Sequence, residues 1–335
     1  SVRAHGLVPV PVDGVPDRLE PELAARERAL SPWSRVLVAA HLFGAVADLG
    51  AARAFARRHG LLFVEDCAQS YAPGRFWGHR DSDVRMLSFG PIKTDSALGG
   101  GILFVRDGAL RTRMDELHWA LPVQTRPAYA RRVLKYAGLQ ILSLRSTFAL
   151  FRAACRLAGR DFDAVLQRAS RGFGDGDVLP RFRRRPATPL LALLARRVRR
   201  VNARVQARAE AGASLARALP AGLARPGAAS AEHSHWVFPV LTKHPDALMR
   251  HLRERGFDAT PGTSSLAAVA VAPERPDVRA PGAAAVMAGI LFLPAYPEVP
   301  PQARWRLAEA LAGWVEGSAA NDPPTPERVA AASGP

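Results

Sequence analysis

Two apolar runs that each end in a polar residue restrict the fold of this chain most strongly. Residues 35–41 have the pattern of a strand that ends in His41, and residues 61–66 that of a strand that ends in Asp66. The segment between them, residues 48–59, has the pattern of a helix, and Gly60 follows as a typical helix end. This order predicts a right-handed crossover in a parallel sheet that is buried on both faces. His41 and Asp66 would then lie at the carboxyl edge of the sheet, where such folds bind ligands.

The rest of the chain continues this α/β pattern. We expect further strands at residues 7–13, 84–89, 101–105, 235–241 and 290–294, and further helices at residues 19–30, 128–159, 189–219, 245–255 and 301–316. With 335 residues and 48% apolar content, the chain can bury a large core. We predict a large domain over residues 1–219, a small α/β domain over residues 220–318 and a disordered tail over residues 319–335.

The positive charge is concentrated in one segment. Of the net charge of +16, residues 131–204 supply about +14, because they combine eighteen Lys and Arg with four acidic residues. Most of this segment lies in a predicted basic helical insert at about residues 119–186. Three interpretations stay open: a helical subdomain with a solvated Arg face, a contact with an anionic membrane surface, and a site for an acidic substrate.

Several classes of protein are disfavoured by the composition. The insert is too interrupted to span a membrane, and no nucleic-acid-binding motif is present, so we expect no nucleic-acid partner. The two cysteines do not make a disulfide framework, so we expect the protein to be located in the cytoplasm. No CxxC or HExxH pattern predicts a metal site.

Five sequence blocks occur in an order that is specific as a set. In chain order they read His41-Leu42-Phe43-Gly44, Val64-Glu65-Asp66-Cys67-Ala68-Gln69, Ser88-Phe89-Gly90-Pro91-Ile92-Lys93, Leu98-Gly99-Gly100-Gly101 and Leu293-Pro294-Ala295-Tyr296-Pro297. In these blocks the chain resembles the DegT/DnrJ/EryC1/StrS aminotransferases. The resemblance implies an α/β fold of the aspartate aminotransferase type (fold type I), with a central, mostly parallel sheet. It also implies pyridoxal 5'-phosphate (PLP) as cofactor and a homodimer.

The resemblance assigns roles to five residues. Lys93 would form the Schiff base with the cofactor, which requires a lysine on a constrained loop. Asp66 would hold the pyridine nitrogen protonated, although an Asp at this junction also suits a helix N-cap. Gln69 would approach the phenolic oxygen of the ring, and Ser88 would donate to the phosphate. His41 would flank the ring, with a purely structural His as the alternative.

The implied reaction is transamination. An amino acid, glutamate in most of the family, would donate an amino group to a keto group on a nucleotide-linked sugar or a related metabolite, with Lys93 moving the proton. A degenerate family member that acts as a partner or regulatory protein is one alternative. A basic peripheral membrane-associated protein is another.

Three departures from the family pattern accompany the resemblance. The family has a phosphate-binding loop and a ring-stacking residue before the block at residues 7–13, so we expect an N-terminal truncation. Where the family has an Asn-Tyr-Arg block, residues 183–188 contain no Asn. Residues 119–179 exceed the usual family length and form an insertion.

Overall fold

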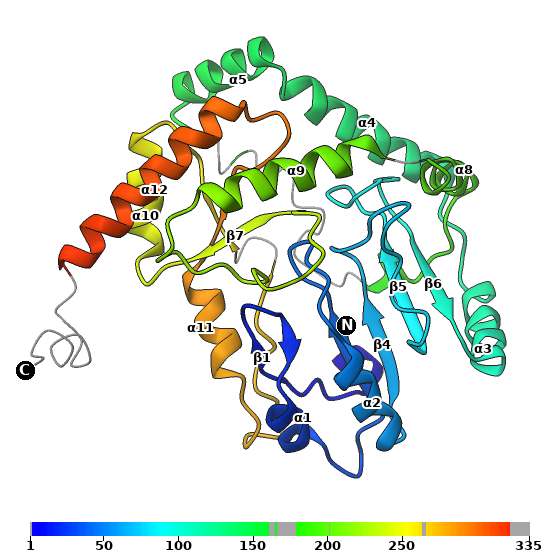
Figure 1. Cartoon of the computed structure of the whole chain (residues 1–335). Helices are drawn as coiled ribbons and strands as arrows, with labels where there is room; N and C mark the ends of the chain where they lie inside the picture. Colours follow the sequence, from blue (N-terminus) through cyan, green and yellow to red (C-terminus); the bar gives the residue numbers. More distant parts are fainter. Residues whose placement is uncertain (1, 161–164, 166–178, 201, 263–265, 322–335) are drawn as a thin grey trace, which may run out of the picture. The chain divides into compact units, whose positions relative to one another are not determined.

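The computed structural model describes residues 2–160, 165, 179–200, 202–262 and 266–321. These residues form two compact units, drawn together in Figure 1. The first unit contains Met86–Val201, and the second contains Val2–Arg85 together with Asn202–Pro335. This division differs from the predicted domains, because the N-terminal strands share a unit with the C-terminal part of the chain. Among the described residues, no helix has both the length and the apolar content that crossing a bilayer requires.

The N-terminal half of the second unit contains the predicted crossover. Its elements are the 3-10 helix η1 (Arg3–His5), β1 (Gly14–Val15), β2 (Glu20–Pro21), α1 (Leu23–Ala29), β3 (Val36–Ala40), α2 (Gly50–Arg58) and β4 (Leu62–Asp66). Strands β3 and β4 pair in parallel, from Val36 opposite Leu62 to Ala40 opposite Asp66. Phe55 and neighbouring alanines of α2 pack with Leu37 and Phe63 in one core cluster. The strand–helix–strand prediction for residues 35–66 is therefore confirmed.

Strand β3 is buried on one face only, so the prediction of burial on both faces is wrong for it. Leu37 and Ala39 face the core shared with α2, whereas Val36 and Val38 are 43% and 60% exposed. A continuous run of Val, Leu and Ala does not show which side of a strand is covered, because every position is apolar.

The predicted strand at residues 7–13 does not form. Pro9 and Pro11 have no N–H to donate to a neighbouring strand, and the paired residues begin only at Gly14. Asp13, predicted as the acidic end of a strand, instead caps a helix. Its carboxylate accepts hydrogen bonds from the backbone N–H groups of Gly282 and Ala283, at 2.8 and 2.7 Å, in the first turn of α11 (Pro281–Gly289).

The C-terminal half of the second unit is a three-stranded antiparallel sheet with helices. Besides α11, its elements are α9 (Ala203–Ala218), β7 (Phe238–Leu241), α10 (Pro245–Glu254), β8 (Thr260–Pro261), β9 (Ile290–Leu293) and α12 (Pro301–Asn321). The strand order is β7-β9-β8. One core cluster joins the sheet to α9, α10 and α12 through Leu215, Leu248, Leu291, Leu307 and others. The predicted strands and helices of this part form, and α12 extends to Asn321, beyond its predicted end at residue 316.

The first unit contains the lysine loop and the basic helices. Its elements are the end of β5 (Val84–Ser88), β6 (Gly101–Val105), α3 (Gly108–Trp119), α4 (Arg126–Leu142), α5 (Arg145–Leu157), α7 (Leu179–Phe182) and α8 (Thr188–Val198). Two predicted long helices are each divided. Residues 128–159 form α4 and α5, because the backbone of Leu144 is extended and Ser143 Oγ donates to the Gln140 carbonyl at 2.7 Å. Residues 189–219 form α8 and α9. Residues 161–164 and 166–178 of the predicted insert lie outside the described residues.

Candidate active site

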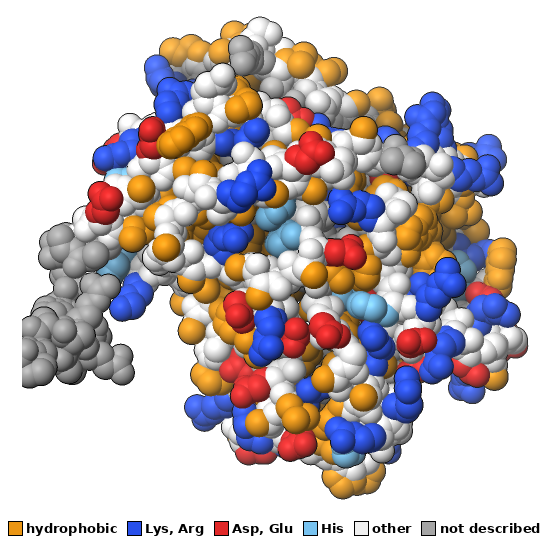
Figure 2. All heavy atoms as spheres, viewed as in Figure 1, with side chains coloured by type: hydrophobic (Ala, Val, Ile, Leu, Met, Phe, Trp, Pro, Cys, Tyr) orange, Lys and Arg blue, Asp and Glu red, His pale blue; other side chains and the backbone are white. Residues whose placement is uncertain are grey.

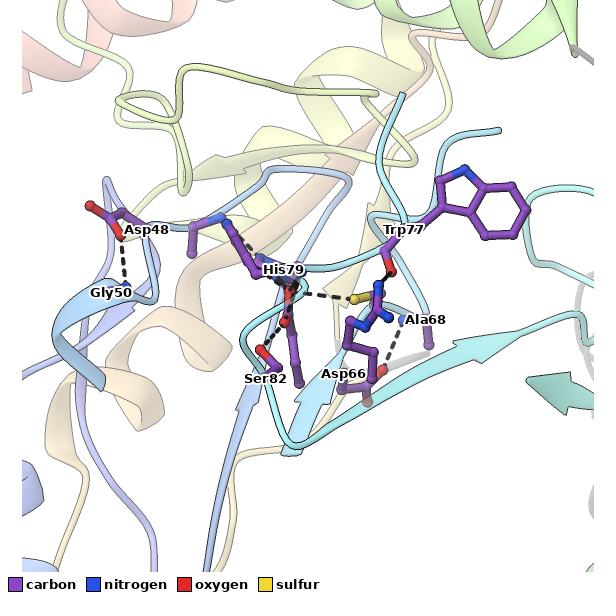
Figure 3. A network of polar contacts seen from close by, with 12 residues as sticks. Asp48, Gly50, Asp66, Ala68, Trp77, His79 and Ser82 are labelled. Carbon is purple, nitrogen blue, oxygen red and sulfur yellow. Dashed lines mark hydrogen bonds and ion pairs between the residues drawn. The ribbon is translucent and has the colours of Figure 1, made fainter. Parts of the chain in front are cut away.

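A buried carboxylate, Glu65, organises the end of β4 in the second unit, and two of its partners, His79 and Ser82, are labelled in Figure 3. It accepts hydrogen bonds from His41 Nε2 at 2.8 Å, from the His79 backbone N–H at 3.0 Å and from the Ser82 hydroxyl. Burial opposes ionisation of Glu65, but the hydrogen bonds from His41, His79 and Ser82 outweigh burial and hold its pKa well below the usual range. The buried group is therefore a carboxylate with several donors around it. The sequence interpretation missed Glu65, because beside Asp66 it looked like one more charge at a strand end.

His41 is fixed by this network through both ring nitrogens. The Ala47 backbone N–H donates to Nδ1 at 3.0 Å, so Nδ1 is the unprotonated nitrogen, and Nε2 carries the proton that is donated to Glu65. The ring is buried and meets the Phe76 ring edge to face at 5.0 Å. His41 therefore ties the end of β3 to the end of β4, and its predicted place beside a cofactor ring stays a prediction.

Asp66 and Gln69 lie at the carboxyl edge of the same two strands. The Asp66 carboxylate accepts from the Ala68 backbone N–H at 2.8 Å, and Gln69 Oε1 accepts from the Phe43 backbone N–H at 2.8 Å (Asp66 and Ala68 in Figure 3). Because a backbone N–H can only donate, the Gln69 atom that faces Phe43 is its oxygen, and its amide nitrogen is the donor for other contacts. The structure thus brings together His41, Asp66 and Gln69.

The turn after β3 requires glycine at position 44. Phe43 and Gly44 both have positive φ, 63° and 93°. A Cβ at Gly44 would lie 2.5 Å from the Trp236 backbone nitrogen, closer than real contacts allow. The Gly44 carbonyl accepts from the Ser234 backbone N–H at 2.7 Å, which joins this turn to the segment before β7.

Two histidines in that segment, His235 buried and His233 half-buried, form a second group that the sequence interpretation missed. The rings of His233 and His235 stack at 3.9 Å. Burial, with nearby arginines, lowers the pKa of His233 to about 3 and that of His235 to about 4. Both rings are therefore neutral near pH 7. Their signal in the sequence is a pair of histidines two residues apart, which alone predicts no contact.

The loop that carries Lys93 belongs to the first unit and is closed at its base by Phe89. The Phe89 N–H donates to the Gly100 carbonyl at 3.0 Å, and the Phe89 carbonyl accepts from Ala97 and Gly99 at 3.0 and 2.9 Å. The Lys93 N–H donates to the Gly90 carbonyl at 3.0 Å in a tight turn. These bonds constrain the loop, as the predicted role of Lys93 requires.

Ser88 and Lys93 border the same small space beside Gly90. A Cβ at Gly90 would lie 3.7 Å from Lys93 Cγ and 3.9 Å from Ser88 Oγ. The structure therefore brings these two predicted residues together, with the side-chain stem of Lys93 and the Ser88 hydroxyl beside Gly90.

Helix α4 of the insert supports the far end of this loop. The Tyr129 hydroxyl donates to the Ala97 carbonyl at 2.9 Å, and Arg132 Nη1 donates to the Leu98 carbonyl at 3.0 Å. Tyr129 also packs with Leu98 and Leu190 in a buried cluster, and burial raises the pKa of its hydroxyl. The insert is therefore part of the lysine site, a role that its sequence did not reveal.

The Arg-rich segment that replaces the expected Asn block is held inside the first unit. Arg185 Nε donates to the Leu121 carbonyl at 2.9 Å, and its guanidinium lies 4.8 Å from the centre of the Trp119 ring. Arg185 therefore connects the two ends of the insert.

His41, Glu65 and Cys67 place donor atoms within 4.8 Å of one another, a spacing that could hold a metal ion. Their protonation favours hydrogen bonding instead. The bond from Ala47 leaves the proton on His41 Nε2, and burial, followed by the charges of Glu65 and Asp66, raises the pKa of the Cys67 thiol. Metal binding would need the deprotonated forms of both groups.

The predicted site residues fall into two sets, one in each compact unit. Asp66, Gln69 and His41 form the set in the second unit, and Ser88 and Lys93 form the set in the first. Each set has groups that PLP needs: in one, a carboxylate that would accept from the protonated ring nitrogen and an amide that would donate to the phenolic oxygen, and in the other an amine and a hydroxyl. The residues present therefore fit this cofactor.

Comparisons with known proteins agree with the predicted resemblance. Residues 1–135 match the DegT/DnrJ/EryC1/StrS aminotransferase family, which confirms the resemblance over this part of the chain. The erythromycin biosynthesis sensory transduction protein EryC1 of Saccharopolyspora erythraea is 44% identical over 120 residues, which cover 34% of this chain and 32% of that protein. The L-glutamine:2-deoxy-scyllo-inosose aminotransferase of Micromonospora echinospora is 40% identical over 125 residues, 35% of this chain and 28% of that protein. The chain thus matches about a third of the length of these relatives.

Solved structures confirm the fold. The sugar aminotransferase CalS13 of Micromonospora echinospora has a TM-score of 0.61 at 22% identity, covering 93% of this chain and 76% of that one. NtdA of Bacillus subtilis, solved with its cofactor PMP, has a TM-score of 0.62 at 17% identity, covering 94% of this chain and 64% of that one. The predicted α/β fold of the aspartate aminotransferase type is therefore correct.

Proposed function

We propose that this protein is a PLP-dependent aminotransferase that moves an amino group from an amino acid, such as glutamate or glutamine, to a keto group on a nucleotide-linked sugar or a related cyclic metabolite. The observation that carries the proposal is the Lys93 loop, which is closed at its base by Phe89, supported by Tyr129 and bordered by Ser88. Two relatives support this class of acceptor by their names: an L-glutamine:2-deoxy-scyllo-inosose aminotransferase and a dTDP-3-amino-3,4,6-trideoxy-alpha-D-glucose transaminase.

Each residue has a defined task in this proposal. PLP, when bound, supplies an electron sink for the bonds at the α-carbon of the amino acid. Lys93 would hold the cofactor through Nζ, would take the proton from the α-carbon of the amino donor, and would later deliver a proton to the keto carbon of the acceptor. Asp66 would keep the pyridine nitrogen protonated. The Gln69 amide would donate to the phenolic oxygen, and the Ser88 hydroxyl would donate to the phosphate.

His41 has an indirect place in the same proposal. Its two ring nitrogens bind Ala47 and Glu65, so its part beside the cofactor would be a contact through the ring face. We also place the enzyme in the cytoplasm as a homodimer, because two cysteines make no disulfide framework and because the resemblance implies sites between subunits.

The test uses the three lysines of the chain, Lys93, Lys135 and Lys243. Purified protein supplied with PLP should develop a visible absorbance band and should transfer ¹⁵N from labelled glutamate or glutamine to a nucleotide-linked keto-sugar. Lys93→Ala should abolish both signals, whereas the matched variant Lys135→Ala should retain them. A protein that develops no band with PLP would instead be a degenerate family member that acts as a partner or regulator.

A further inference from the structure

Helices α4 and α5 follow one another through a short turn and form a basic helix pair, here residues 126–160, whose charge has one sign. From Leu117 to Arg160 the sequence contains no Asp or Glu. The Lys and Arg residues of this stretch are Arg126, Arg131, Arg132, Lys135, Arg145, Arg152, Arg156 and Arg160. Arg132 is engaged with the lysine loop through the Leu98 carbonyl. A stretch with eight cations and no acids attracts anionic partners.

One face of α4 is apolar and exposed. Leu134 and Ile141 are 70% and 59% exposed, and their spacing of seven residues places them on one stripe of the helix. The opposite face carries Tyr129 and supports the lysine loop. Arg131 lies one turn from Leu134, at three residues, and Lys135 lies one turn from Arg131, at four residues, so the two cations flank the stripe on one side.

Helix α5 also has an exposed apolar stripe. Leu150 and Leu157, again seven residues apart, are 73% and 90% exposed, and Cys155 is buried. On a helix with 3.6 residues per turn, Arg152 and Arg156 fall on a different side from Leu150 and Leu157. Apolar side chains cover much of the upper edge over α5 in Figure 2, with Lys and Arg side chains nearby. The helix is thus amphipathic, with a leucine stripe and an arginine side.

We propose that the basic helix pair binds an anionic lipid surface, with the helices in the plane of the interface. Leucines on a stripe gain from contact with acyl chains, and the cations beside them gain from anionic headgroups. The same cations argue against a second copy of the chain as occupant, because two basic helix pairs of equal positive charge would repel each other. A soluble polyanion would pair with the arginines and leave the leucine stripes in water.

Such a contact would bring the lysine loop close to a membrane. Tyr129 and Arg132 of α4 hold the Ala97 and Leu98 carbonyls on the face opposite Leu134. The side of α4 that meets the lipid therefore differs from the side that supports the loop, and both contacts can exist at once.

The experiment is flotation of the full chain with vesicles. The protein should float with vesicles of phosphatidylcholine and phosphatidylglycerol, stay in solution with phosphatidylcholine alone, and be released by high salt. Arg131→Gln/Lys135→Gln should weaken binding by about tenfold or more, because each cation near the surface contributes to affinity. The matched control Arg250→Gln/Arg253→Gln removes the same charge from exposed positions of α10 and should leave binding unchanged.

A second pair of variants tests the leucine stripe. Leu150→Ser/Leu157→Ser should reduce binding by roughly tenfold, because the apolar contact with the acyl chains is lost. Leu23→Ser, at an exposed leucine of α1, should have no effect.

Equal binding to neutral vesicles, or equal loss in the α10 control, would overturn the proposal. Self-association without lipid that the leucine variants abolish would assign the surface to a second copy instead. Binding to single-stranded RNA that the leucine variants leave intact would assign it to a polyanion.

Discussion

Replacement of Glu65 by glutamine tests whether the buried carboxylate holds the ends of β3 and β4 together. Glutamine has nearly the same size, so the variant changes charge and hydrogen bonding and makes no large cavity. Glu65 now accepts from His41 at 2.8 Å, from the His79 backbone at 3.0 Å and from Ser82. The amide of the glutamine would offer one acceptor oxygen. Its NH2 group would stand in place of the second carboxylate oxygen and would place hydrogens against groups that also donate.

The expected loss of stability follows from these contacts. Hydrogen bonds to a charged group contribute about 1.5–3 kcal/mol each, and breaking a buried charged pair costs roughly 3–5 kcal/mol. We therefore expect Glu65→Gln to lower the free energy of unfolding by about 3–4 kcal/mol at pH 7. Urea unfolding followed by circular dichroism measures it. The control is Glu254→Gln, at an exposed position of α10, which should change the free energy by less than about 0.5 kcal/mol.

The pH dependence gives a second, independent check. The pKa of Glu65 is lower in the folded chain than its ordinary value of 4.5, because the donors around the carboxylate favour its charged form. This stability is present above about pH 4.5 and is lost as the pH falls below that value. The difference between wild type and Glu65→Gln should therefore shrink between about pH 5 and pH 3. A variant as stable as wild type at pH 7, or a difference that does not change with acid, would refute the reasoning.

Two other substitutions test the local geometry. Tyr129→Phe removes the hydrogen bond to the Ala97 carbonyl, so it should lower the free energy of unfolding by about 1–2 kcal/mol and weaken PLP binding in a titration, whereas Tyr136→Phe on the same helix should do neither. Gly44→Ala should lower the midpoint of thermal unfolding strongly, since a Cβ there would lie 2.5 Å from the Trp236 nitrogen at a φ of 93°; an unchanged midpoint would show that the turn can relax.

Much of the fold was predictable where one periodic signal dominated. The bounds of β6 agree with the prediction, and β3, α2 and β4 lie within a residue or two of theirs because a helix pattern separates two apolar runs. The predicted strand at residues 7–13 failed because Pro9 and Pro11 cannot donate to a sheet. The division of residues 128–159 into two helices depends on the local conformation of Leu144, which the apolar pattern does not encode.

The residues of the candidate site that lie in the family blocks could be predicted as site residues, except Glu65. Ser88 and Lys93 border one space, and Asp66 and Gln69 share one sheet edge, as the blocks predict. Glu65 was missed because its partners His79 and Ser82 come from a loop far along the chain. Long-range contacts of this kind follow from the tertiary fold and leave no spacing signal in one sequence.

The most direct test of the account is to locate PLP on the chain. The protein is incubated with the cofactor, reduced with borohydride, digested and mapped by mass spectrometry, which reports which of Lys93, Lys135 and Lys243 carries the pyridoxyl group. The account predicts stoichiometric modification at Lys93 and little at the other two. Modification spread over all three lysines, or its absence from Lys93, would contradict it.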